Sequence, residues 1–109
     1  MNERNLHPAL MEALLNAAPV NTSAGFYRTS NGAELDLVMS IPGHGVWAME
    51  IKRGLGSPLQ RGFYSACDDI QPARRFVVYP AGEAFSLGQG VEAVGLRAMA
   101  ELLRGCRLR

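Results

Sequence analysis

Three residues, Asp36, Glu50 and Lys52, have the types and spacing expected of a metal site that cleaves phosphodiesters. Glu50 and Lys52 are two residues apart in a segment that alternates like a β-strand, so both side chains project from one face. Asp36 lies on the preceding predicted strand, and adjacent strands are about 4.8 Å apart. The two carboxylates, with a backbone carbonyl such as that of Ile51, would form the oxygen-rich site that suits Mg²⁺ or Mn²⁺.

A metal ion held by these carboxylates would polarise a phosphodiester and lower the pKa of bound water. Lys52 would position or deprotonate that water, or stabilise negative charge on phosphate. Lys52 is the only lysine among eleven Lys and Arg residues, which favours a specific need for a compact ammonium group. The alternative is that Glu50 and Lys52 line a solvated strand face, with Asp36 as their cross-strand partner.

The first half of the chain predicts one helix followed by a three-stranded meander. Apolar residues recur at helical spacing between Pro8 and Pro19, and the Asn31-Gly32 pair predicts a tight turn between strands. The predicted segments are a helix at 8–18, a loop at 21–25 and strands at 26–29, 34–41 and 46–52.

Alternation within the second and third strands assigns side chains to faces. In the second strand one side carries Glu34, Asp36 and Val38, and the other side carries Leu35, Leu37 and Met39. In the third strand Trp47 faces the core on the side opposite to Glu50.

The second half predicts a helix at 59–70, starting near Ser57-Pro58, and a buried strand at 76–79. That strand follows a helical crossover, so it should lie parallel to one meander strand through a right-handed connection. The remaining predicted segments are a loop at 83–90, a short edge strand at 90–96 and a closing helix at 97–103. The predicted fold class is therefore α/β, with the order α-β-β-β-α-β and a further β-α, in which helices flank a mixed central sheet.

Length and composition fit one globular domain over residues 1–109, with 48% apolar and 19% charged residues. The net charge of +1 means that a grip on DNA must come from a local patch, a partner or a metal. Cys67 and Cys106 lack zinc-site spacing and are expected to be reduced and mostly buried. The sequence lacks an apolar run long enough to span a membrane and a secretion signal at its start, so a cytoplasmic protein is expected.

Three stretches carry a family resemblance: FYRTSNGAELDLV at 26–38, WAMEIKR at 47–53 and RRFVVYP at 74–80. Together they resemble the domain called DUF4143, which is usually the C-terminal domain of bacterial and archaeal ATPases of the AAA+ type. The family is regarded as a divergent member of the PD-(D/E)XK nuclease-like superfamily. The resemblance therefore implies a restriction-endonuclease-like core with the element order predicted above.

By this resemblance Asp36 matches the metal-binding aspartate, Glu50 the second acidic ligand and Lys52 the motif lysine. The segment 32–36 fits the GxxxD spacing of RecB-like nucleases. The implied cofactor is Mg²⁺ or Mn²⁺, bound by Asp36 and Glu50.

Two auxiliary residues are also implied. Gln60 begins a QxxxY match at 60–64, which lies closer to the motif lysine than is usual. Glu12 corresponds to an acidic residue of the first helix, although a helical wheel places it at or past the edge of the apolar stripe.

Four arginines flank the predicted site: Arg53, Arg61, Arg74 and Arg75. They are candidates for a rim that binds the phosphates of DNA. An equally good interpretation is that they only solvate the surface.

The sequence leaves two functions open. The first is a metal-dependent DNA endonuclease or nickase. The second is a non-catalytic DNA-binding or assembly module of an AAA+-type ATPase, for which an ATPase domain or subunit would be a partner. The sequence lacks the GxxxxGK[ST] loop, so this chain does not hydrolyse ATP by that route. Many resolvase-like relatives are dimers, which allows a homodimer, but the sequence shows no self-complementary surface.

Overall fold

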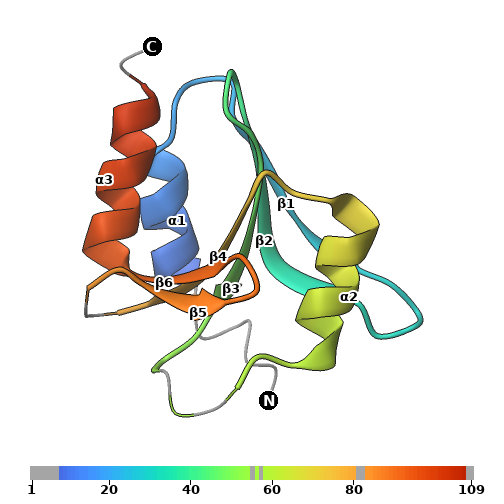
Figure 1. The fold of residues 1–109 in the computed structure, drawn as a ribbon. Helices are drawn as coiled ribbons and strands as arrows, with labels where there is room; N and C mark the ends of the chain where they lie inside the picture. Colours follow the sequence, from blue (N-terminus) through green and yellow to red (C-terminus); the bar gives the residue numbers. More distant parts are fainter. Residues whose placement is uncertain (1–7, 55, 57, 81–82, 108–109) are drawn as a thin grey trace.

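The computed structural model describes residues 8–54, 56, 58–80 and 83–107. A six-stranded mixed sheet forms its centre, in the spatial order β1-β2-β3-β4-β6-β5. Helices cover both faces of this sheet, with α1 and α3 side by side on one face and α2 on the other (Figure 1). The α/β class and the mixed sheet flanked by helices are therefore confirmed.

The chain enters through α1 (Pro8–Ala17) and then builds the antiparallel meander of β1 (Ser23–Arg28), β2 (Glu34–Ile41) and β3 (Gly45–Ile51). The predicted bounds of the helix and of the second and third strands hold to within one residue. β1 begins three residues before the predicted strand, because Ser23 pairs with Ser40 across the sheet although its neighbours Ala24 and Gly25 favour strands weakly.

α2 (Arg61–Ile70) crosses from β3 to β4 (Arg74–Tyr79), which pairs parallel to β3 as predicted. The helix begins two residues later than expected, with Gln60 in extended backbone conformation at the N-cap position. The start predicted at Ser57 lies outside the described residues.

The end of the chain differs most from the prediction. The segment predicted as a loop contains β5 (Phe85–Gly88), and β6 (Val91–Gly95) is an interior strand between β4 and β5. Gln89 and Gly90, both with positive φ, form the tight turn that joins the two strands. Gln-Gly is not among the strong hairpin signals, so the local sequence does not predict this turn. α3 (Leu96–Cys106) then closes the fold.

Two apolar clusters hold the three layers together. The larger fills the space between the sheet and α1 with α3, and it includes Leu14, Trp47 and Met99. The smaller lies under α2 and is centred on Phe63 and Ala66. Trp47 is 2% exposed, so its predicted place in the core is confirmed.

One strand face was predicted wrongly. Leu35 packs in the cluster under α2, whereas Leu37 and Met39 pack in the cluster on the opposite face. The pairing of β1 with β2 explains the switch. Gly25 pairs with Val38 and Tyr27 pairs with Leu35, so two steps along β1 correspond to three steps along β2. β2 thus carries one extra residue at this point, and such a bulge inverts the alternation of the side chains.

No helix within the described ranges is both long and apolar enough to cross a membrane.

Candidate functional site

The candidate site begins at the bulge of β2, where Asp36 lies. Regular pairing between β2 and β3 ends at Leu37 and Met49, so the backbone of β2 does not pair with β3 beyond that point. Past this point the side chain of Asp36, instead of the β2 backbone, bonds to β3: its Oδ2 accepts a hydrogen bond of 2.9 Å from the Ile51 backbone N–H. Bulges often redirect a side chain in this way near functional sites. The half-buried carboxylate of Asp36 therefore points at the centre of the Glu50-Ile51-Lys52 segment.

Glu50 and Lys52 project from the α2 face of β3, as the alternation predicted. Their neighbour Ala48 packs under α2, and Met49 packs on the opposite face. Both side chains are half-buried. Lys52 Nζ donates a hydrogen bond of 3.2 Å to the carbonyl of Pro58, and its backbone N–H donates to the Val78 carbonyl. The strand end is thus tied to β4 by its backbone and to the start of the α2 segment by its ammonium group.

The chemistry of the donor set fits a hard cation. Mg²⁺ is commonly bound by one or two carboxylates, with water and phosphate oxygens completing the shell. Asp36 supplies a carboxylate whose orientation is set by its hydrogen bond to Ile51. Glu50 supplies a second on the adjacent strand. Within the part of the chain that the structure describes, no group of three or more His, Cys, Asp or Glu side chains is arranged around one metal position.

The two auxiliary candidates lie at different places. Glu12 is exposed on α1, in the layer on the other side of the sheet from α2. It therefore does not share the face of Glu50 and Lys52. Gln60 is exposed just before α2, and its side chain does not cap the helix. It adjoins Leu59 and Pro58, the latter being the residue whose carbonyl accepts from Lys52.

The four arginines do not form one rim. Arg74 and Arg75 are neighbours on β4, so their side chains leave opposite faces of the sheet. The Arg74 guanidinium lies 5.2 Å from the ring centre of Trp47 and 4.8 Å from that of Phe76, both in the cluster on the α1 and α3 face. Arg74 therefore lies apart from the other predicted rim residues, on the face of the sheet opposite Glu50 and Lys52.

Arg75 lies on the α2 face, where its positive charge acts on the Cys67 thiol of α2. Arg53 is exposed directly after β3, and Arg61 is exposed at the first position of α2. Arg61 and Arg75 thus lie on the side of the sheet that carries Glu50 and Lys52, and Arg53 follows Lys52 directly in the chain.

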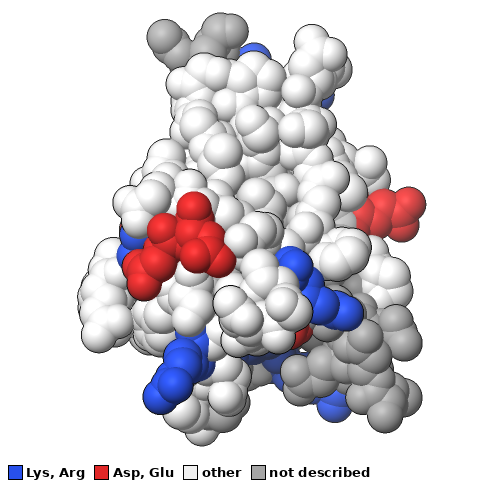
Figure 2. All heavy atoms as spheres, turned by 90° about the vertical axis from the view of Figure 1, so that its right-hand side faces the viewer, with Lys and Arg blue, Asp and Glu red and all other residues white. Residues whose placement is uncertain are grey.

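Charges are sparse on the visible part of the α2 side (Figure 2). Basic and acidic groups stand apart on a mostly uncharged surface, and this view shows no continuous basic stripe. This agrees with the net charge of +1.

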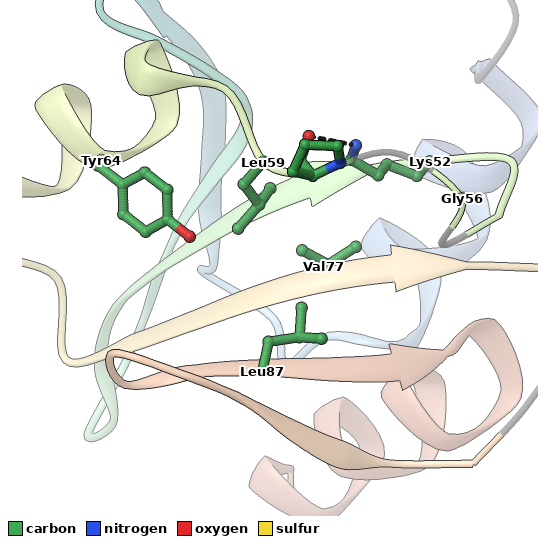
Figure 3. A pocket seen from close by; sticks show the side chains of 7 residues that line it. Lys52, Gly56, Leu59, Tyr64, Val77 and Leu87 are labelled. Atoms are coloured by element: carbon green, nitrogen blue, oxygen red, sulfur yellow. Dashed lines mark hydrogen bonds between the residues drawn. The ribbon is translucent and has the colours of Figure 1, made fainter.

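Sequence reasoning missed a cavity next to Lys52. It has a volume of about 270 Å³ and is lined by Lys52, Gly56, Pro58, Leu59, Tyr64, Val77 and Leu87. Figure 3 shows these side chains converging from the end of β3, from α2 and its preceding segment, and from β4 and β5. Leu87 lies in the segment predicted as a loop, so no sequence signal pointed to it as part of a wall.

The comparisons with known proteins support one assignment. The family model described as "Domain of unknown function (DUF4143)" matches residues 9–99. The chain belongs to the DUF4143 family. The family resemblance inferred from the three sequence stretches is thereby confirmed, and nearly all of α1, the whole sheet and the first turn of α3 lie inside the matched region.

Two mycobacterial proteins resemble this DUF4143 domain. They are the uncharacterized protein Mb2031c of Mycobacterium bovis and the uncharacterized protein Rv2008c of Mycobacterium tuberculosis. Each is 39% identical to this chain over 69 residues, which covers 63% of the chain but 15% of the longer relative. No solved structure matches the chain.

Proposed function

We propose that this DUF4143 domain is a PD-(D/E)XK-like, metal-dependent DNA endonuclease or nickase. One observation carries the proposal: the Asp36 carboxylate is held at the backbone of Ile51, between the two other residues of the motif. A solvated strand residue has no need of a bulge that turns its carboxylate onto the neighbouring strand. The arrangement therefore favours a functional role over simple surface solvation.

In this proposal Asp36 and Glu50 hold Mg²⁺ or Mn²⁺. The ion would polarise the phosphodiester and lower the pKa of a bound water molecule. Lys52 places a positive charge at the same strand end, where it would stabilise charge on phosphate or orient the attacking water. The hydrogen bond from Lys52 to Pro58 restricts the ammonium group to this position.

The proposed DNA contacts come from Arg53, Arg61 and Arg75. Each contributes to phosphate binding without reading sequence. A net charge of +1 makes weak, salt-sensitive binding the expectation for the chain alone. Action on cellular DNA also agrees with the expected cytoplasmic location.

The second candidate is a non-catalytic DNA-binding or assembly module of an AAA+-type ATPase. Two observations favour it. The match covers 15% of each mycobacterial relative, so those proteins contain much more than this domain. In addition, β1 is an edge strand whose outer backbone groups can pair with another chain, and it carries Phe26, which is 65% exposed. Contact with an ATPase domain, or with a second copy of the chain, would cover it.

A cleavage assay separates the two candidates. The purified chain is incubated with supercoiled and branched DNA in Mg²⁺ or Mn²⁺, beside Asp36→Asn and Lys52→Ala. The nuclease proposal expects nicked or linear product from the wild type and a loss of at least about a hundredfold in each variant, typical for removing a group that acts on the transition state. Asp36→Asn is chosen because its amide oxygen still accepts the Ile51 hydrogen bond.

Asp69→Asn is the matched control, because it neutralises an aspartate that accepts a hydrogen bond away from the motif, here from the Tyr27 hydroxyl at 2.9 Å. It should cut as the wild type does. Absence of cleavage by the wild type with either metal, or equal cleavage by Asp36→Asn, would leave the module as the better function.

A further inference from the structure

The cavity beside Lys52 combines one positive charge with apolar walls. Leu59, Val77 and Leu87 form much of its lining, and the ring of Tyr64 closes the side toward α2 (Figure 3). Lys52 lies at the opposite end, where its ammonium group is bound to the Pro58 carbonyl. A ligand with an apolar body and a negative charge at one end matches this lining.

The size of the cavity narrows the class of ligand. Pockets for drug-sized molecules have volumes of about 300–1,000 Å³. The cavity, at about 270 Å³, lies just below this range and suits one small ring system. A single nucleotide meets all the conditions, because its base is a flat ring and its phosphate carries the charge.

We infer that this cavity is a subsite for the base of one unpaired nucleotide, whose phosphate lies toward Lys52. The inference rests on the proposed function, in which Lys52 faces the scissile phosphodiester. A base inside a duplex is stacked and paired, so it enters a side pocket only from a single strand or after flipping out. The site thus selects unpaired strands, flaps or frayed ends over continuous duplex.

The edge strand β5 supplies one wall of this subsite. It pairs outside β6 and carries Leu87 into the cavity, on the same face as Val77 of β4. Without β5, the cavity would lack the wall that Leu87 forms. Apolar and aromatic contacts also suit a surface with few positive charges, because stacking on a base does not depend on them (Figure 2).

Binding measured without cleavage tests the subsite. The full chain, in EDTA and at low salt, is titrated into a labelled oligothymidylate and into a labelled hairpin duplex, and fluorescence anisotropy gives the dissociation constants. The wild type should prefer the single strand. Leu87→Asp should weaken single-strand binding about tenfold, as expected for the loss of one base contact, and leave duplex binding nearly unchanged.

Phe85→Asp is the matched control. Phe85 is on the same strand and 47% exposed, against 43% for Leu87, but it does not line the cavity. Both variants add the same charge to an exposed position, and thermal unfolding checks that both remain folded. Phe85→Asp should bind the single strand within about twofold of the wild type, a difference of roughly 0.4 kcal/mol.

Three outcomes would overturn the subsite: equal affinity of the wild type for both DNAs, equal weakening by the two variants, or displacement of the strand by thymidine monophosphate as effectively as by unlabelled strand. The last would indicate a site for free nucleotides. Single-strand binding that depends on Leu87 supports the subsite even where Mg²⁺ and Mn²⁺ give no cleavage, in which case only the hydrolytic function fails. If the wild type cleaves DNA and Leu87→Asp cleaves it equally well, the hydrolytic function stands and the subsite fails.

Discussion

Asp36 and Ile51 are joined by a hydrogen bond from the Ile51 backbone N–H to the Asp36 carboxylate, at 2.9 Å. The bond stands where the β2–β3 ladder has ended, so a side chain satisfies a backbone donor that the neighbouring strand does not. The same contact sets the position of the carboxylate beside Glu50 and Lys52. Stability and the proposed chemistry therefore depend on one group.

Replacing Asp36 should separate these two roles. Asp36→Ala leaves the Ile51 N–H without its acceptor and should lower the free energy of unfolding by about 1–3 kcal/mol. Asp36→Asn keeps an acceptor and should cost about 1 kcal/mol, because a neutral acceptor bonds more weakly than a carboxylate. Urea denaturation measures both values. Equal losses for the two variants would contradict a hydrogen bond that stabilises the fold.

Arg74 and Arg75 should behave differently when each is replaced by alanine. Arg74 contacts two aromatic rings and pairs with Glu92 at 2.7 Å, so Arg74→Ala should lower stability by about 1–2 kcal/mol. It should leave DNA affinity unchanged, because its side chain lies on the face opposite Lys52. Arg75→Ala should weaken DNA binding and reduce its dependence on salt. Denaturation and anisotropy titrations at several salt concentrations test this, and a larger loss of affinity in Arg74→Ala would refute the assignment of faces.

Two helical glycines provide a matched pair of substitutions. At Gly62 of α2, a Cβ atom would overlap the backbone oxygen of Gly32, in the turn between β1 and β2. Gly62→Ala should therefore push α2 off the sheet and cost at least about 1–3 kcal/mol. At Gly105 of α3 a Cβ atom meets no neighbour within 4 Å, so Gly105→Ala should stabilise by up to about 1 kcal/mol. Melting temperatures that move in the same direction would disprove this packing argument.

The two thiols should be slow to react in the folded protein. Burial raises the pKa of Cys67, and nearby Arg75 only partly offsets this; burial likewise raises the pKa of Cys106. Since the thiolate is the nucleophile, a disulfide reagent such as Ellman's reagent should label neither thiol quickly at neutral pH, and both quickly in denaturant.

The raised pKa values of the two thiols also affect stability, because the folded state keeps these protons to a higher pH than the unfolded state does. Stability should accordingly fall as the pH rises above the unfolded thiol value of about 8.5.

The pH prediction is checked by urea denaturation across the alkaline range. Cys67→Ser with Cys106→Ser should reduce the alkaline loss of stability, because the two titrating thiols are gone. Rapid labelling of the native protein at neutral pH would show that one of the thiols is accessible.

The sequence alone determined the elements whose signal is local. Helical spacing in α1 and α2, alternation in β3 and the Asn31-Gly32 turn depend on neighbouring residues, and each was predicted to within a few positions. The opposite faces of Trp47 and Glu50 follow from the two-residue period of a strand, which no long-range contact disturbed. For the same reason, the shared face of Glu50 and Lys52 follows from their spacing alone.

Only the tertiary structure decided how these elements meet. The bulge in β2 arises from the register with β1. The residues of β2 alone therefore do not predict that Leu35 switches to the α2 face, nor the direction of the Asp36 carboxylate. β5 forms because β6 offers it a partner, although its own residues resemble a loop. The cavity beside Lys52 then results from segments far apart in the chain, because Tyr64, Val77 and Leu87 become neighbours only when the sheet and α2 pack together.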